Sequence, residues 1–157
     1  MFLFACVVEK TVRLLLSLTL FLSFIPVSQA VYNPKEYNIW YIHGGVLYGA
    51  TQTEDEEPVL ISIAGPTTDW ANMVISLMSH EPCDPTKVTT EFAFNNDMLT
   101  VEYRCLKAAD HTVSSYTLHD AVKVNQLYNQ LKSGFTVTLD KRIKVWAANI
   151  ATPKNSD

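Results

Sequence analysis

The stretch Val88–Leu106, VTTEFAFNNDMLTVEYRCL, decides how the chain should fold. In its second half, Met98–Leu106, apolar side chains alternate with polar ones, which is typical of a strand with one buried face. Its first half, Val88–Phe94, is rich in β-branched and aromatic residues. Asn95-Asn96-Asp97 lies between the halves and can turn the chain, because Asn and Asp tolerate positive φ. The stretch therefore predicts a β-hairpin with Cys105 on its apolar side.

Further strand-like runs lie on both sides of this hairpin. Gly44-Gly45 and Asp140-Lys141-Arg142 each separate two such runs, which indicates two more hairpins. Residues 69–80 fit either a helix or a strand, and the neighbouring runs favour a strand. The other predicted strands are 38–43, 46–53, 59–64, 112–117, 135–139 and 143–148.

One segment, residues 118–133, has the pattern of an amphipathic helix. Its apolar residues fall on one helical face, and Gly134 follows at the position of a C-cap glycine. Thr117-x-x-Asp120 resembles a capping box with Asp in place of Glu. We therefore predict a mainly β (α+β) fold, either an antiparallel β-sandwich or a barrel-like sheet, with one helix in the C-terminal half at about 118–133.

Residues 1–30 have the pattern of a cleavable signal peptide. Leu14–Phe24 is an apolar run that follows basic residues, and it spans only about half of a ~30 Å hydrocarbon layer, which disfavours the alternative of a membrane anchor. Small residues at Ser28 and Ala30 place cleavage between Ala30 and Val31. The predicted organisation is a signal peptide at 1–30, one β-rich domain at 31–151 and a flexible tail at 152–157. No stable membrane anchor is expected after cleavage.

The apolar residues that precede Lys10 are unusual, because a signal peptide normally opens with its charged region. Translation from Val8 through a GTG codon would remove them. This hypothesis points to a bacterial source.

The composition excludes several classes of function. The chain is 48% hydrophobic and 18% charged, as expected of a globular domain. Without residues 1–30, which carry Glu9, Lys10 and Arg13, it has 10 basic and 15 acidic groups and a net charge of -5. Because basic clusters are absent from the sequence, neither nucleic acid nor an anionic membrane surface is expected as a partner.

Cys83 and Cys105 are the two cysteines that follow residue 30, and an even pair in an exported chain indicates a disulfide. A metal-binding or catalytic thiol is the alternative, since His80 lies three residues from Cys83. No second His/Cys pair accompanies them in the sequence, so no metal or other cofactor is predicted. The acidic run Glu54–Glu57 reads as a solvated turn, because it lacks the spacing of a calcium loop. The predicted location is periplasmic or secreted.

Local catalytic signatures are missing from the sequence: it contains no G-x-S-x-G motif, phosphate loop or dinucleotide fingerprint. His43, His80, His111 and His119 are far apart in sequence, and only the fold could bring one of them to a Ser and an Asp. No catalytic residue is therefore predicted.

Aromatic residues are the candidates for contact with a partner. Trp40, Tyr41, Trp70 and Trp146 would form an anchor for a partner protein if they were exposed and contiguous. The alternative is that they pack in the core or across strands, as aromatics commonly do in sheet-rich domains.

The C-terminal part of the chain resembles a known family. Its landmarks are the cysteine strand Tyr103–Cys105, the segment Leu118–Ala121, the helix end Leu127–Gly134 and the closing strands. Together they are similar to the second half of the invasion-associated locus B family of small exported bacterial proteins. That family usually has two cysteines close together here, whereas Cys105 stands alone. The resemblance covers roughly a third of the chain and implies a non-enzymatic envelope protein of β-sandwich type.

The sequence therefore predicts an exported, non-enzymatic binding or accessory protein of the bacterial envelope, either virulence-associated or inhibitor-like. It would act through a protein or envelope partner. Two alternatives remain open: a small periplasmic hydrolase with a non-local His/Ser/Asp site, and a periplasmic component of a secretion or conjugation apparatus.

Overall fold

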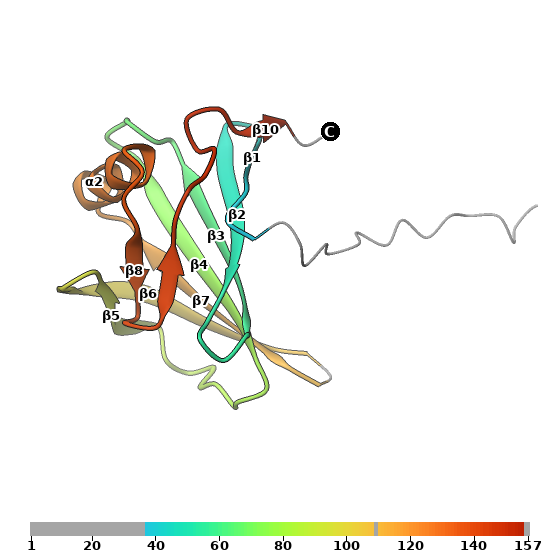
Figure 1. The fold of residues 1–157 in the computed structure, drawn as a ribbon. Helices are drawn as coiled ribbons and strands as arrows, with labels where there is room; N and C mark the ends of the chain where they lie inside the picture. Colours follow the sequence, from blue (N-terminus) through green and yellow to red (C-terminus); the bar gives the residue numbers. More distant parts are fainter. Residues whose placement is uncertain (1–36, 109, 156–157) are drawn as a thin grey trace, which may run out of the picture. The chain divides into compact units, whose positions relative to one another are not determined.

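A computed structural model describes residues 37–108 and 110–155. Within these residues, ten strands form one sheet and α2 (Ala121–Lys132) lies against it (Figure 1). The strands are β1 (Trp40–His43), β2 (Val46–Gln52), β3 (Pro58–Ala64), β4 (Asn72–Ser79), β5 (Thr89–Phe94), β6 (Asp97–Lys107), β7 (Thr112–Leu118), β8 (Val137–Leu139), β9 (Ile143–Val145) and β10 (Lys154–Asn155). The predicted signal peptide and its cleavage point between Ala30 and Val31 lie outside the described residues.

The sheet has the order β10-β1-β2-β3-β4-β7-β6-β5-β8-β9. All neighbouring strands are antiparallel except β1 and β10, which are parallel. The hairpin read from Val88–Leu106 is present as β5 and β6, and the ambiguous run 69–80 contains the strand β4. The prediction of a mainly β fold with one helix in the C-terminal half is confirmed.

The sheet curls until its two halves meet along a seam. Thr53, just after β2, forms an isolated antiparallel bridge with Ile143 of β9. Nearby, Thr51 Oγ1 donates a hydrogen bond to the carbonyl oxygen of Lys144 at 3.3 Å. Of the two predicted forms, the barrel-like sheet is the one observed, as a half-barrel and not as two stacked sheets.

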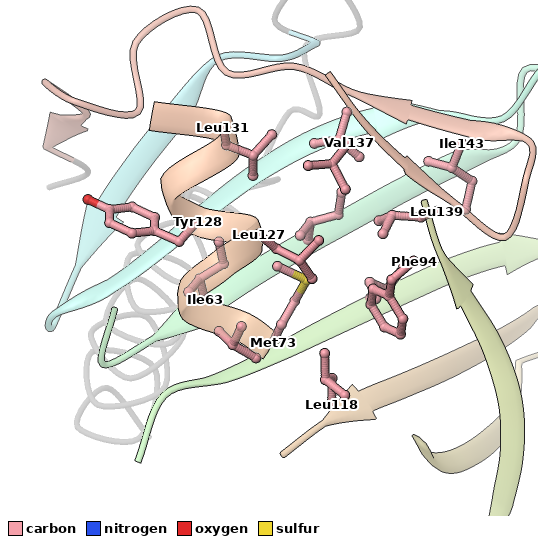
Figure 2. Close-up of a cluster of buried hydrophobic side chains, with 14 of the residues drawn as sticks. Ile63, Met73, Phe94, Leu118, Leu127, Tyr128, Leu131, Val137, Leu139 and Ile143 are labelled. Carbon is pink, nitrogen blue, oxygen red and sulfur yellow. The ribbon is translucent and has the colours of Figure 1, made fainter. Parts of the chain in front are cut away.

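α2 packs against one end of the curled sheet (Figure 2). Its apolar face, which includes Leu127 and Leu131, meets buried residues from β3, β4, β5, β7, β8 and β9. Those shown in Figure 2 are Ile63, Met73, Phe94, Leu118, Val137, Leu139 and Ile143. All of them are at most 3% exposed, so this end of the interior is a closed apolar core.

The ends of α2 are set by local signals. Asp120 is the N-cap, and its side chain accepts a hydrogen bond from the backbone N–H of Lys123. The capping box predicted from Thr117 is wrong, because Thr117 belongs to β7 and pairs with Val74. At the other end, Gly134 has a φ of 82°, and the N–H of Phe135 donates to the carbonyl of Gln130 at 3.0 Å. This is a Schellman arrangement, and it confirms Gly134 as the predicted C-cap glycine.

The predicted flexible tail, 152–157, needs a correction at two positions. Lys154 and Asn155 form β10, which pairs in parallel with Tyr41 and Ile42 of β1. A two-residue strand has no sequence periodicity, so the edge of β1 decides this pairing. No helix in 37–108 or 110–155 is long and apolar enough to cross a membrane.

Candidate functional site

A cavity of about 290 Å³ lies inside the curled sheet at the end opposite α2. We call this cavity the mouth. Leu77 and Ser79, at the C-terminal end of β4, line it, as do Thr112, Ser114 and Tyr116 at the start of β7. Because β4 and β7 are antiparallel neighbours, these residues come together, while the other ends of the two strands reach the core beneath α2.

Hydroxyl groups give the mouth a fixed polar frame. Thr112 Oγ1 lies within hydrogen-bonding distance of two carbonyl oxygens, 3.2 Å from that of Ser79 and 2.7 Å from that of Glu81. Ser79 Oγ donates to a carboxylate oxygen of Glu57 at 2.5 Å. These bonds join β7, β4 and the loop that follows β4, so the wall of the mouth does not depend on apolar packing alone.

Two tyrosines extend the polar wall. The rings of Tyr103 and Tyr116 lie 5.3 Å apart, and the Tyr103 hydroxyl is 3.3 Å from Ser114 Oγ. Burial, and then the neighbouring Tyr103, raise the pKa of Tyr116 above its ordinary value. Tyr116 is therefore a neutral phenol at physiological pH and can donate a hydrogen bond.

The mouth also carries charges of both signs. Arg142 pairs with Glu57 at 3.6 Å across the seam, and its Nε donates to Asp140 at 3.1 Å. Lys87 Nζ lies 5.6 Å from the centroid of the Tyr103 ring. On the rim, hydrogen bonds from Thr86 hold the pKa of Asp84 below its ordinary value.

A disulfide joins Cys83 to Cys105, as the sequence predicted. Their Cα atoms are 5.9 Å apart, and Cys83 lies in the β4–β5 loop that forms one side of the mouth. The bond ties this loop to β6. Cys83 is therefore no free thiol that could bind a metal together with His80, whose Nδ1 lies 3.0 Å from the carbonyl oxygen of Asp110. In the part of the chain that the structure describes, no cluster of three metal-ligating side chains is found.

The four predicted partner-binding aromatics do not form one anchor. Trp40 is a core residue, only 1% exposed, so its prediction as a contact residue is wrong. Its ring packs against Gly49, where a Cβ atom would lie 3.0 Å from the indole. Tyr41 is half-buried and stacks on Tyr48 with ring centroids 5.7 Å apart.

Trp70 and Trp146 are exposed, by 62% and 59%. Trp70 follows β3 and lies over Gly65, whereas Trp146 follows β9. Neither of them lines the mouth.

The four histidines have separate surroundings, and none lines the mouth. His111 Nδ1 is 2.7 Å from Asp110 Oδ1, and His119 Nε2 is 2.9 Å from Glu102 Oε2. The hydrogen bond from His119, more than that from Arg104, lowers the pKa of Glu102. The mouth therefore does not combine a histidine with its serines.

Sequence reasoning missed the residues of the mouth. Glu57, Thr112, Tyr116 and Arg142 come from distant segments that only the sheet order brings together. One signal was available: Thr112, Ser114 and Tyr116 place polar atoms on the same face of a strand as the apolar Leu118. An inward face that changes from apolar to polar marks an interior that opens to solvent.

A second hollow, a groove of about 640 Å³, follows the outer face of α2 from Val122 to Phe135. Amide side chains and one serine make up the rest of its lining, and it has no charged group. The mouth is the candidate site, because its lining combines hydroxyl and phenol groups with charged side chains.

In comparisons with known proteins, no protein-family model, curated protein or solved structure matches this chain. The resemblance to invasion-associated locus B proteins stays a prediction.

Proposed function

We propose that this chain is an exported, non-enzymatic binding or accessory protein of the bacterial envelope, periplasmic or secreted, and that the mouth holds a polar group of a partner protein. The observation that carries the proposal is the change in one continuous interior from an apolar core beneath α2 to a polar cavity at the other end. The mouth of a barrel-like sheet is a common place for binding.

The chemistry of the mouth suits a side chain or a chain end of a protein. Its volume of about 290 Å³ is at the lower limit of small-molecule pockets, which run from roughly 300 to 1,000 Å³. Phenol and hydroxyl groups can donate or accept hydrogen bonds, and Lys87, Glu81 and Asp84 add charges of both signs around the opening. A partner segment with both donors and acceptors would find complementary groups there.

The disulfide supports a location outside the cytoplasm, because such bonds persist in oxidising compartments. It also supports recognition through the mouth. Since it fixes the β4–β5 loop beside the opening, less ordering of that loop would be needed on binding.

A pair of charge reversals tests this proposal. Lys87→Glu changes the charge at the mouth, and Lys132→Glu makes the same change in the exposed last turn of α2, at the other end of the sheet. Each protein is immobilised and exposed to the envelope extract of the source bacterium, and the retained proteins are quantified by mass spectrometry. We expect the amount of one retained protein to fall at least tenfold with Lys87→Glu and to stay unchanged with Lys132→Glu. Equal retention by the two variants would count against the mouth.

A further inference from the structure

One edge of β5 has no neighbouring strand over most of its length. β5 pairs with β6 from Thr89 to Phe94, whereas β8, on its other side, pairs with it at Phe94 alone. The turn that follows β8 adds one bond, from the N–H of Asp140 to the carbonyl of Ala93 at 2.8 Å. Within the described residues, no strand lies beside Thr89–Phe92 on this side. We call this stretch the open edge.

The register of β5 shows which backbone groups the open edge presents. The N–H of Tyr103 in β6 donates to the carbonyl of Val88 at 2.8 Å, so Val88 and every second residue after it point their backbone groups toward β6. Thr89 and Glu91 therefore point theirs away from β6. In 37–108 and 110–155, these groups meet no other backbone, and the carbonyl of Glu91 only accepts from Thr90 Oγ1 at 3.4 Å.

The open edge forms part of the rim of the mouth. Side chains alternate along β5, so Thr90 points into the mouth while Thr89 and Glu91 are exposed on the outer face. Val88, on the same face as Thr90, is 69% exposed. A strand added to this edge would therefore send every second side chain toward the mouth and the others to the outer face.

Opposite charges stand on the two faces of the open edge. On the outer face, Glu91 Oε1 accepts a hydrogen bond from Thr100 Oγ1 at 2.5 Å, and no cation of the described chain pairs with this carboxylate. In the mouth, the ammonium group of Lys87 lies over the ring of Tyr103 and forms no ion pair with any described residue. Each charge can therefore take an opposite one from a partner without breaking an existing pair.

We propose that an extended segment of the partner protein adds to the open edge as a strand antiparallel to β5, in line with β8, and closes this side of the half-barrel. The inference rests on the proposed function, because it takes the mouth as the recognition site. The N–H and C=O groups of Thr89 and Glu91 supply the backbone bonds. In strand addition such bonds give affinity, and alternate side chains give specificity.

The charges indicate the sequence of the added segment. In an antiparallel strand, the residue opposite Glu91 comes directly before the residue opposite Thr90. A basic residue in the first position would meet the Glu91 carboxylate, and an acidic residue in the second would enter the mouth beside Lys87. A second copy of this chain fits less well, since its own β5, Thr89–Phe94, brings no cation to Glu91.

A peptide titration followed by NMR tests this proposal. The probe is the acetylated and amidated pentapeptide Thr-Lys-Glu-Thr-Val, and the control is Thr-Glu-Lys-Thr-Val, which has the same composition with the charges exchanged. Each is added up to about 5 mM to the ¹⁵N-labelled protein, expressed from the full-length sequence, because so short a contact should bind with a Kd of about 1 mM. We expect the probe to shift the amide resonance of Glu91 and to slow its hydrogen exchange. The control should bind at least fivefold more weakly.

Two substitutions at one position separate the backbone from the side chain. Glu91→Ala removes the carboxylate and keeps the N–H, whereas Glu91→Pro removes both, and an edge strand tolerates proline where the N–H has no partner. We expect the probe to bind Glu91→Pro at least tenfold more weakly than Glu91→Ala. Thermal melting shows whether both variants are folded. A probe that is N-methylated at its lysine cannot donate to the Glu91 carbonyl, and it should lose at least tenfold in affinity for the unchanged protein.

The proposal is overturned if the probe shifts no amide of β5, if the control binds as well as the probe, or if N-methylation has no effect. A dimer that sediments as such and dissociates in Glu91→Pro would also overturn it, because the occupant would then be a second copy. In all these cases the proposed function stands if Lys87→Glu still lowers the retention of an envelope protein. Equal retention by Lys87→Glu and Lys132→Glu, with the probe still bound at β5, would contradict the proposed function and support the open edge alone.

Discussion

The two ends of the curled sheet differ although the same strands build both. Beneath α2, Phe94 of β5 and Leu118 of β7 are almost fully buried among apolar neighbours. A few residues away on these strands, Thr90 and Ser114 line the mouth among hydroxyl and charged groups. The difference teaches that one set of strands can separate two tasks. The closed end supplies stability through packing, and the open end presents polar atoms to solvent and, under the proposed function, to a partner.

The largest difference between the two ends should appear when one side chain is truncated at each. Phe94→Ala removes a fully buried ring from the closed end and should lower the free energy of unfolding by about 3–5 kcal/mol. Thr90→Ala, on the same strand at the mouth, should cost less than about 1 kcal/mol. Urea unfolding measures both. Comparable losses at the two positions would contradict the division of tasks.

The next effect concerns the covalent bond beside the mouth. Cys83→Ser should lower the free energy of unfolding by about 3 kcal/mol, because the disulfide closes a loop between residues 22 apart in sequence. It should also leave Cys105 open to alkylation, as mass spectrometry of the iodoacetamide-treated protein would show. An unchanged melting temperature would mean that hydrogen bonds such as those of Thr112 hold the β4–β5 loop without it.

A smaller effect depends on pH. Because the folded state raises the pKa of Tyr116, its neutral form contributes stability that is fully present below the unfolded pKa of about 10. That stability is lost as pH rises through the folded pKa. Tyr116→Phe should therefore change stability by at most about 1 kcal/mol at pH 7 and should reduce the decline above pH 10. Urea unfolding from pH 8 to pH 11 measures how the free energy of unfolding depends on pH in both proteins. An identical dependence would show that burial in the fold does not raise the pKa of Tyr116.

Local signals predicted much of the fold. Alternation over Met98–Leu106 and the Asn95–Asp97 turn were enough for the β5–β6 hairpin, and an apolar stripe ending at Gly134 was enough for α2. The disulfide could be predicted because Cys83 and Cys105 are the two cysteines beyond the expected signal peptide. The hairpin and the helix depend on residues close in sequence, and the disulfide depends on the number of cysteines.

The mouth and the seam depend on long-range pairing, which the sequence does not specify. β4 pairs with β7, across 32 intervening residues, so Ser79 and Thr112 meet although no local motif links them. The same limit explains the error at Trp40, because its burial depends on Gly49 across the hairpin and on Asn149 near the C-terminus.

Site-directed photo-crosslinking in the native envelope tests the central claim, that the mouth is where this protein meets its partner. A photoreactive phenylalanine analogue replaces Thr90 in the mouth or, as the control, Val122, which is 82% exposed on the outer face of α2. We predict a discrete crosslinked species from position 90 that is absent from position 122 and is lost when Lys87→Glu is added. A crosslink from position 122 with none from position 90 would contradict the assignment and move the recognition surface to α2.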